Sequence, residues 1–349
     1  MPSKLAPSRV DPSTAGEDFW KRYHEFRRVR QKQQDPDDPL RDDPAEEARM
    51  KRVNPFEAQE RFEMSRDGVM VSWFYGSTVK PESPEYATSK HLYEADIFVR
   101  REQRRQRIGA SWLPLLVERM DSHGCTTVGF WTQEKAGNEF MRWVGAEPKL
   151  RSIESRLRFS EIRWSTVEQW DAEGPKRSPQ TTVELRDGHA PESEWADLTR
   201  QLSALLNTIP FEAMDHGEIV ITPETLRDFY ARLDFGGERQ LTVVAREPNG
   251  LISGLTDVLW APYRPTIIHQ QFTGVRPEAR GRGVGKWIKA AMLLWLRDLY
   301  PETQWIVTDN AGSNAPMLKI NRTLGFKPHR EGAEYQMTRD QLASRRNAR

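Results

Sequence analysis

The stretch FTGVRPEARGRGVGK, from Phe272 to Lys286, decides the interpretation of the chain. It leads from an apolar, strand-like segment through a glycine-rich turn into an amphipathic helix predicted over 283–299. Because glycine lacks a Cβ atom, consecutive N–H groups of such a turn can point toward one place. The N-terminus of a helix there favours negative charge, and basic side chains add to it. The turn therefore predicts a pyrophosphate-binding loop, whose glycines and cations are Gly281, Gly283, Gly285, Arg280, Arg282 and Lys286.

Two other glycine-rich nucleotide-binding patterns do not fit this stretch. A P-loop needs a hydroxyl residue after its lysine to hold Mg²⁺, and Trp287 stands there instead. A dinucleotide fingerprint follows the first strand of its domain and has an acidic residue about 20 positions later. The present loop comes late in its half of the chain, after several predicted strands.

Composition sets the wider frame. At 349 residues the chain is long enough for two domains of ~100–200 residues each. The net charge of +1 gives no drive toward nucleic acid or anionic membrane, and the single cysteine, Cys125, excludes a disulfide framework or a cysteine-rich metal site. There is no apolar run of ~20 residues and no apolar signal-peptide core. We therefore expect a cytoplasmic protein with no metal, and its tryptophans could serve a homodimer or a domain interface.

The hydrophobic pattern predicts two similar halves. Each has two helices, three strands, and then helix, strand, helix and strand, and an opening strand is clear only in the second half. The segment DAEGPKRSPQ has the composition of a linker. We expect a mixed α/β sheet in each of two domains, 1–170 and 181–349, joined by the linker 171–180.

An internal repeat supports this division. The segment Arg101–Leu113 can be laid without gaps on Pro277–Lys289, so that Gly109 falls on Gly285. The first copy is eroded, because Arg107 stands where the second copy has Gly283.

Two motifs in the second half resemble those of the GNAT superfamily of N-acetyltransferases. Val275, Pro277 and the loop 280–285 resemble its acyl-CoA pyrophosphate loop. The segment Asn310–Asn314 and Leu324-Gly325-Phe326 resemble its second signature. The resemblance is strong over 267–328 and implies two tandem GNAT-fold domains, the N-terminal one degenerate. It implies acetyl-CoA as co-substrate and an active C-terminal domain.

The resemblance also implies residue roles. Backbone groups of Thr273, Gly274 and Val275 would hold the pantetheine arm, with one N–H polarising the thioester carbonyl. Asn314 would bind the same arm. Many relatives have a tyrosine that protonates the departing thiolate at the position of Asn321, and an asparagine cannot do so. Ser313, His329 or a water could substitute. The residues expected at the pyrophosphate are Arg280, Gly281, Arg282, Gly283, Val284, Gly285 and Lys286.

Several residues are candidates for the base that accepts a proton from the acceptor amine. They are His269 and Asp257 on predicted strands, and Glu212, Asp215 and His216 in the loop 210–218. The acids of this loop suggest a cationic acceptor, although acids also simply keep a surface loop soluble. His269 is equally compatible with a structural role.

The first copy departs further from the family pattern. Its arginines could still attract phosphates, or they could form a solvated face on a scaffold domain; they are Arg100, Arg101, Arg104, Arg105 and Arg107. No partner pattern supports Cys125 as a nucleophile.

The sequence thus predicts direct acetyl transfer from acetyl-CoA to a primary amine, in a small molecule or a protein, within a ternary complex. The alternative is a CoA-binding sensor or scaffold without turnover, since Asn321 replaces the tyrosine and the first copy is eroded.

Overall fold

The computed structural model describes residues 5–346, which form two compact units. The first unit contains residues 5–150, 213–218 and 332–346, and the second contains 151–212 and 219–331. Both units are therefore discontinuous along the chain, whereas the sequence suggested the continuous domains 1–170 and 181–349.

The first unit contains a mixed sheet with the strand order β1-β2-β3-β4-β5-β12. Only β4 and β5 are parallel, and every other neighbouring pair is antiparallel. The opening strand is two residues long, which explains why the sequence did not reveal it. The strands are β1 (Ser8–Arg9), β2 (Glu57–Arg66), β3 (Val69–Val79), β4 (Leu92–Val99), β5 (Thr127–Thr132) and β12 (Lys327–Thr338).

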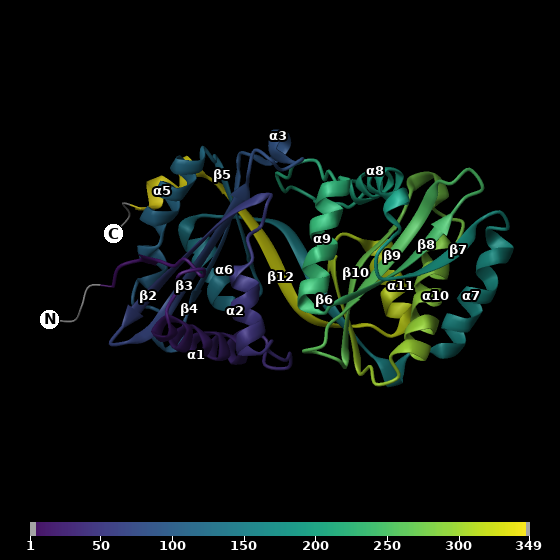
Figure 1. Ribbon diagram of the computed structural model, residues 1–349, viewed down its shortest axis with the longest axis horizontal. Coiled ribbons are helices and arrows are strands. Elements are labelled where there is room, and N and C mark those ends of the chain that lie inside the picture. The colour runs from purple at the N-terminus through teal and green to yellow at the C-terminus, as the bar shows by residue number, and fades with distance from the viewer. Residues whose placement is uncertain (1–4, 347–349) are drawn as a thin grey trace. The chain divides into compact units, whose positions relative to one another are not determined.

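Helices cover both faces of this sheet (Figure 1). The helical spacing of its aromatic residues gives the first helix one apolar face, which packs on Met70 and Trp73. Helices pack on the opposite face of the sheet, where Trp112, Leu116 and Met141 belong to the core. The helices are α1 (Glu17–Gln34), α2 (Asp43–Lys51), α3 (Tyr86–Ser89), α4 (Ile108–Ser111), α5 (Leu113–His123), α6 (Lys135–Val144) and α12 (Arg339–Arg346).

The second unit repeats this plan with the strand order β6-β11-β10-β9-β8-β7. Its one parallel pair is β10 with β11. Strand β6 borders β11 in antiparallel register, just as β12 borders β5 in the first unit. The strands are β6 (Pro148–Arg158), β7 (Thr182–Asp187), β8 (Arg239–Arg246), β9 (Ile252–Trp260), β10 (Ile267–Val275) and β11 (Trp305–Ala311).

Two groups of helices enclose the second sheet. One face carries α7 (Trp164–Arg177), α10 (Val284–Leu299) and α11 (Ala315–Leu324), with α7 and α10 side by side (Figure 1). The other carries α8 (Trp195–Leu206) and α9 (Pro223–Gly236).

The segment 171–180 corrects the sequence interpretation. Most of it is helical, because α7 continues to Arg177, and no extended linker forms there. Its glycine serves packing: a Cβ atom on Gly174 would lie 2.2 Å from the Trp287 ring, so the two helices approach closely at this point.

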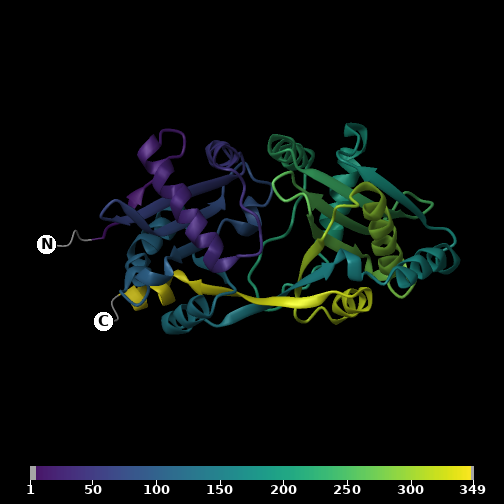
Figure 2. The same cartoon turned by 90° about the horizontal axis from the view of Figure 1, so that it is seen from below.

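The last strand is also longer than the predicted segment near 335–337. Figure 2 shows β12 as one continuous yellow strand between α11 and the C-terminal helix. The first residues of β12 belong to the second unit and its last residues to the first. Strand β6 does the reverse: it begins in the first unit and ends in the second.

Candidate active site

A gap opens in the second unit where two parallel strands part. The parallel register of β10 with β11 runs from Ile267 opposite Trp305 to Gln270 opposite Thr308. Beyond Gln270 the register of β10 shifts in a bulge, and Thr273–Val275 is in register with β9 alone. The edge of β10 that faces β11 is therefore left open over the three residues predicted to hold the pantetheine arm.

The bulge is fixed by two buried side chains. The Gln270 Nε2 donates to Thr256 Oγ1 (3.0 Å), Asp257 O (2.6 Å) and Phe272 O (3.0 Å). The Asp257 Oδ1 accepts the Phe272 N–H at 3.0 Å, and its Oδ2 accepts from Gln240 at 2.7 Å. Burial raises the pKa of Asp257 to about 6. Asp257, a predicted base, thus has both oxygens engaged in holding the bulge.

The glycine-rich loop follows β10 directly. A short 3-10 helix, Pro277–Ala279, leads to Gly281 and Gly283, with φ of 78° and 88°, and α10 begins at Val284. Within residues 5–346, the five N–H groups from 281 to 285 have no hydrogen-bond partner. These amides precede a 16-residue helix, so the predicted anion-binding loop has the conformation its glycines suggested.

Arg177, the last residue of α7, and its C-cap Ser178 bind carbonyl groups of the glycine-rich loop. The Arg177 Nη2 donates to Gly281 O at 2.9 Å, and the Ser178 Oγ donates to Arg282 O at 3.3 Å. Because the carbonyl groups are held on this side, the loop N–H groups remain available to a ligand.

The predicted cations of the loop differ in their availability. Arg282 is paired with Glu247 at 3.1 Å and donates to Thr181. Arg280 is exposed and donates through Nε to Val275 O. Lys286 is exposed above the Trp170 ring. Arg280 and Lys286 are therefore the two cations free to meet a phosphate without losing an ion pair.

Two asparagines lie near the beginning and middle of α11. Asn314 is the N-cap and accepts the Met317 N–H at 3.3 Å. Asn321 is buried, and its Nδ2 donates to Asn310 Oδ1 at 2.7 Å. An amide in this position orders β11 and supplies no acidic proton.

The predicted bases are divided between the two units. Burial, with Arg264 and Arg156, lowers the pKa of His269 to about 3, so its imidazole is neutral at pH 7. Glu212 is exposed in the loop between α8 and α9, with a φ of 52°. The neighbouring residues Asp215 and His216 belong to the first unit.

The loop 213–218 is anchored within the first unit. The Asp215 carboxylate meets His91 Nε2 at 3.0 Å, and the Gln336 side chain binds the main-chain N–H and O of Asp215 at 2.7 and 2.6 Å. The loop expected to cover an acceptor in the C-terminal half thus covers part of β12 in the first unit. Sequence periodicity gives no sign of such a placement.

The first unit repeats the loop geometry with different side chains. Arg105 and Arg107 both have a φ of 62°, matching Gly281 and Gly283, and α4 begins directly after them. Arg104 is paired with Glu134 at 2.6 Å, and Arg105 with Glu139. The eroded copy therefore keeps the backbone path but crowds it with arginines.

Two glutamates lie where the strands of the first unit part. Glu94 is the last residue of β4 in register with β5, and its carboxylate lies over Gly129. Burial raises the pKa of Glu94 to about 7; burial and the Glu94 charge do the same for the pKa of Glu334. Sequence reasoning missed both residues, since neither belongs to a motif.

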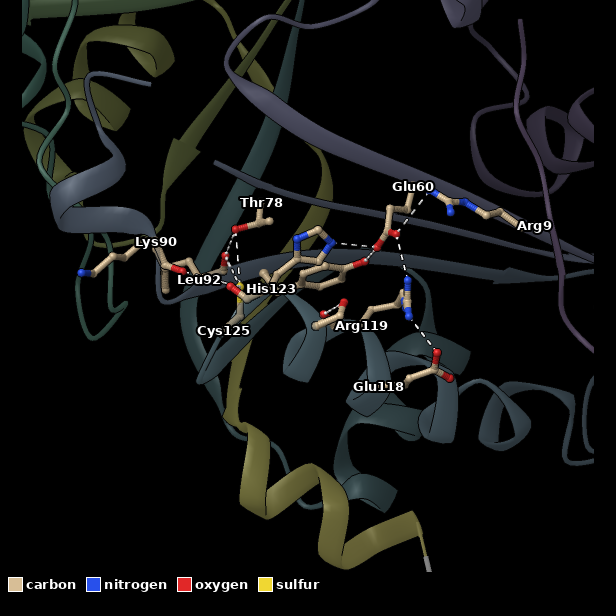
Figure 3. A network of polar contacts seen from close by, with 11 residues as sticks. Arg9, Glu60, Thr78, Lys90, Leu92, Glu118, Arg119, His123 and Cys125 are labelled. Carbon is tan, nitrogen blue, oxygen red and sulfur yellow. Dashed lines mark hydrogen bonds and ion pairs between the residues drawn. The ribbon is translucent and has the colours of Figure 1, made fainter. Parts of the chain in front are cut away.

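A buried network elsewhere in the first unit excludes one further chemistry. Figure 3 shows Glu60 accepting from His123 Nε2 and Arg119 Nη1, each at 3.2 Å, and the pKa of the Cys125 thiol is raised by burial. Cys125 is 3% exposed, and its Sγ lies 3.4 Å from Thr78 Oγ1. Because the imidazole is turned to Glu60, this pair does not form a cysteine–histidine dyad.

Two kinds of feature are absent from residues 5–346. No group of three or more metal-binding side chains lies together in this part of the chain. None of its helices is long and apolar enough to cross a membrane.

Sequence comparison identifies a family for part of the chain. The model of the acetyltransferase (GNAT) family matches residues 20–142, which lie in the half that the motifs suggested to be degenerate. No curated protein matches the sequence.

Solved structures extend the similarity to nearly the whole chain. A tandem GNAT protein from the clavulanic acid biosynthesis pathway, solved without acetyl-CoA, is 18% identical, with a TM-score of 0.73 over 96% of this chain and 99% of its own. A GCN5-related N-acetyltransferase from Sphaerobacter thermophilus is 13% identical, with a TM-score of 0.62 over 97% of each chain. A glucosamine N-acetyltransferase region of a fungal multi-domain GH3 beta-N-acetylglucosaminidase is 12% identical, with a TM-score of 0.63 over 97% of this chain and 38% of that one. The predicted tandem GNAT fold is confirmed.

Proposed function

We propose that the second unit transfers the acetyl group of acetyl-CoA to a primary amine, since residues 20–142 match the GNAT family of acetyltransferases and nearly the whole chain has the tandem GNAT fold. The observation that carries the proposal is the run of five unbonded N–H groups from 281 to 285, at the N-terminus of α10 and directly after the open edge of β10. Such a run fits a diphosphate, and the open edge fits the amides of a pantetheine arm.

Direct transfer in a ternary complex is the simplest chemistry for this site. The acceptor nitrogen attacks the thioester carbonyl, an N–H group of β10 stabilises the oxyanion, and the thiol of CoA leaves. The one cysteine of the chain, Cys125, is buried in the first unit and is therefore not a candidate for a covalent acetyl carrier. A small-molecule amine and a protein amine are both compatible with the site.

Substituting Gly283 by arginine tests the proposal. The variant Gly283→Arg copies Arg107 of the first unit, which has a similar φ, so the chain should still fold. A Cβ atom at this position would lie 3.2 Å from the Arg177 guanidinium, so the new side chain would displace the arginine that holds Gly281 O. We expect acetyl-CoA binding to weaken by about tenfold or more, since one lost charge-assisted contact is worth on the order of 1.5–3 kcal/mol. Calorimetric titration with acetyl-CoA measures this change.

Gly250→Arg is the matched control. Gly250 also has a positive φ, 85°, and a Cβ atom added to it would meet no atom within 4 Å, but it lies in the turn between β8 and β9. This variant introduces the same side chain at a similar φ and should keep its affinity for acetyl-CoA. Equal affinity of Gly283→Arg and the wild type would contradict the proposed site.

A second candidate places the transfer in the first unit. It is favoured by the family match over residues 20–142 and by Glu94, whose raised pKa suits a base at neutral pH. Amine acetylation that persists unchanged in Gly283→Arg would assign the chemistry there. Binding of acetyl-CoA without release of free thiol in the presence of any diamine, aminoglycoside or lysine peptide would instead indicate a sensor.

A further inference from the structure

A buried lysine lies at the point where the two parallel strands of the second unit part. Lys289 of α10 is 3% exposed, and its Nζ is 3.5 Å from the Oε1 of Gln270, the last residue of β10 in register with β11. On another side it lies 5.6 Å from the centre of the Phe326 ring. Within residues 5–346 its polar partner is the Gln270 amide, and no carboxylate is paired with it.

Packing alone does not explain this lysine. In the gapless alignment of the two copies, Leu113 stands at the position of Lys289. Leu113 is 1% exposed in the apolar core of the first unit. The fold therefore accepts an aliphatic side chain here, and an unpaired buried amine is the costlier choice.

The surroundings leave the amine without a competing charge. Ile268, Gln270 and Thr308 face α10, so alternation along the strands turns His269 and Asp309 to the opposite face of the sheet. Asp257 is bound to Phe272 and Gln240, Lys286 lies over Trp170, and Lys319 and Arg322 of α11 are exposed. Burial is the one cause that lowers the pKa of Lys289, to about 7.

Resting on the proposed function, we propose that Lys289 protonates the sulfur of CoA as it leaves, in the role left vacant by Asn321. The pantetheine arm would run along the open edge of β10 toward Gln270, which brings the thioester to the end of the gap, beside the amine. The C–N bond forms, the C–S bond breaks with its electron pair on sulfur, and the ammonium proton moves to that sulfur. Lys289 then recovers a proton from solvent, and the proton lost by the acceptor amine leaves with a base or water.

A titration of bound CoA tests this contact without knowledge of the acceptor. The thiolate of CoA is followed by ultraviolet difference absorbance on the full chain, with desulfo-CoA as the blank. A lysine next to the sulfur stabilises its thiolate, so the bound thiol in the wild type should titrate at least about one pKa unit below that in Lys289→Leu, a roughly tenfold difference in acidity. Lys319→Leu, which removes an exposed lysine of α11, should match the wild type.

Turnover gives the second readout. With an accepted amine, Lys289→Leu should lower kcat by on the order of 10²-fold and leave the acetyl-CoA KM nearly unchanged. With a thioester of an acidic aromatic thiol, which leaves without a proton, the two proteins should react at similar rates. Lys289→Met is the second variant, should the leucine variant fail to fold.

The outcomes separate the two proposals. Equal thiol pKa values in the wild type and Lys289→Leu, both binding CoA, would overturn the role of Lys289 and leave the proposed function intact. Acetylation of Lys289 itself by acetyl-CoA, seen by mass spectrometry as a stoichiometric product during turnover, would also overturn it. Absence of CoA binding in the wild type would contradict the proposed function.

Discussion

The two copies of the glycine-rich loop differ at the position of Gly283 in the second unit, which is Arg107 in the first. Gly283 and Arg107 have φ values of 88° and 62°, so the backbone path does not depend on glycine. The two positions differ in their surroundings, because a Cβ atom added to Gly283 would lie 3.2 Å from the Arg177 side chain that holds the loop. The turn and the start of α10 could be predicted from the sequence, because glycine spacing and helical periodicity are local signals; anion binding by the loop stays a prediction.

Asp257 allows a prediction about stability and pH. Its folded pKa, about 6, lies above the ~3.9 of an unfolded aspartate, so the native state binds more protons between these values. This aspartate therefore destabilises the fold progressively as pH rises from about 4 to 6. In the variant Asp257→Asn the new amide would keep an oxygen for the Phe272 N–H and carry no charge, provided that the Gln240 amide turns its oxygen toward it.

We expect Asp257→Asn to match the wild type near pH 4 and to exceed its free energy of unfolding by about 1–3 kcal/mol at pH 8. Urea unfolding at the two pH values measures this difference. Asp257→Ala is the control, because it also removes the charge but leaves the Phe272 N–H unbonded. A larger stability gain at pH 4 than at pH 8 would contradict the argument.

At the scale of elements, the end of α7 positions a loop that lies 104 residues later in the chain. Arg177 and Ser178 each hold one carbonyl group of the glycine-rich loop. Without Arg177 the loop should sample conformations whose amides diverge. One lost hydrogen bond is worth about 1 kcal/mol, so Arg177→Ala should weaken acetyl-CoA binding about fivefold.

Arg297→Ala is the matched control for this prediction. Arg297 also joins α10 to α7, through Glu168 at 3.2 Å, but at a distance from the loop. Both arginines are largely exposed, so neither substitution should change the melting temperature much. Titration with acetyl-CoA compares the two variants, and equal affinities would show that α7 does not order the loop.

The elements that sequence predicted well are those whose pattern is local. The helix 223–233 begins after a Thr222 cap, and the strands β8, β9 and β10 are separated by turn residues, so their positions could be read from the chain. The segment 171–180 was misread because its glycine and proline suggest a linker. Gly174 is there for the Trp287 ring, a contact that composition does not reveal.

At the scale of the molecule, each unit is completed by a strand from the other half of the chain. Strand β6 lies in register with all seven residues of β11 and contributes Leu157 to the core of the second unit. Strand β12 borders β5 and contributes Tyr335 and Met337 to the core of the first. Hydrophobic periodicity shows that a segment is a strand but does not name its partner, so the sequence could not predict this exchange.

This exchange of strands predicts that neither half of the chain folds when it is expressed alone. A cut between Gln180 and Thr181 follows the domain boundary that composition suggests, yet the fragment 181–349 lacks β6, α7 and five core residues: Leu157, Phe159, Ile162, Val167 and Trp170. Strand β11 then becomes an exposed edge, which favours aggregation. The fragment 1–180 likewise lacks the strand that borders β5. Each fragment expressed alone should therefore be aggregated or lack a cooperative unfolding transition, whereas the two expressed together should form a soluble, cooperatively unfolding pair. Gel filtration and thermal unfolding of the three preparations measure this. The prediction is wrong if the fragment 181–349 is monomeric, unfolds cooperatively and binds acetyl-CoA as the full chain does, because β6 would then be dispensable.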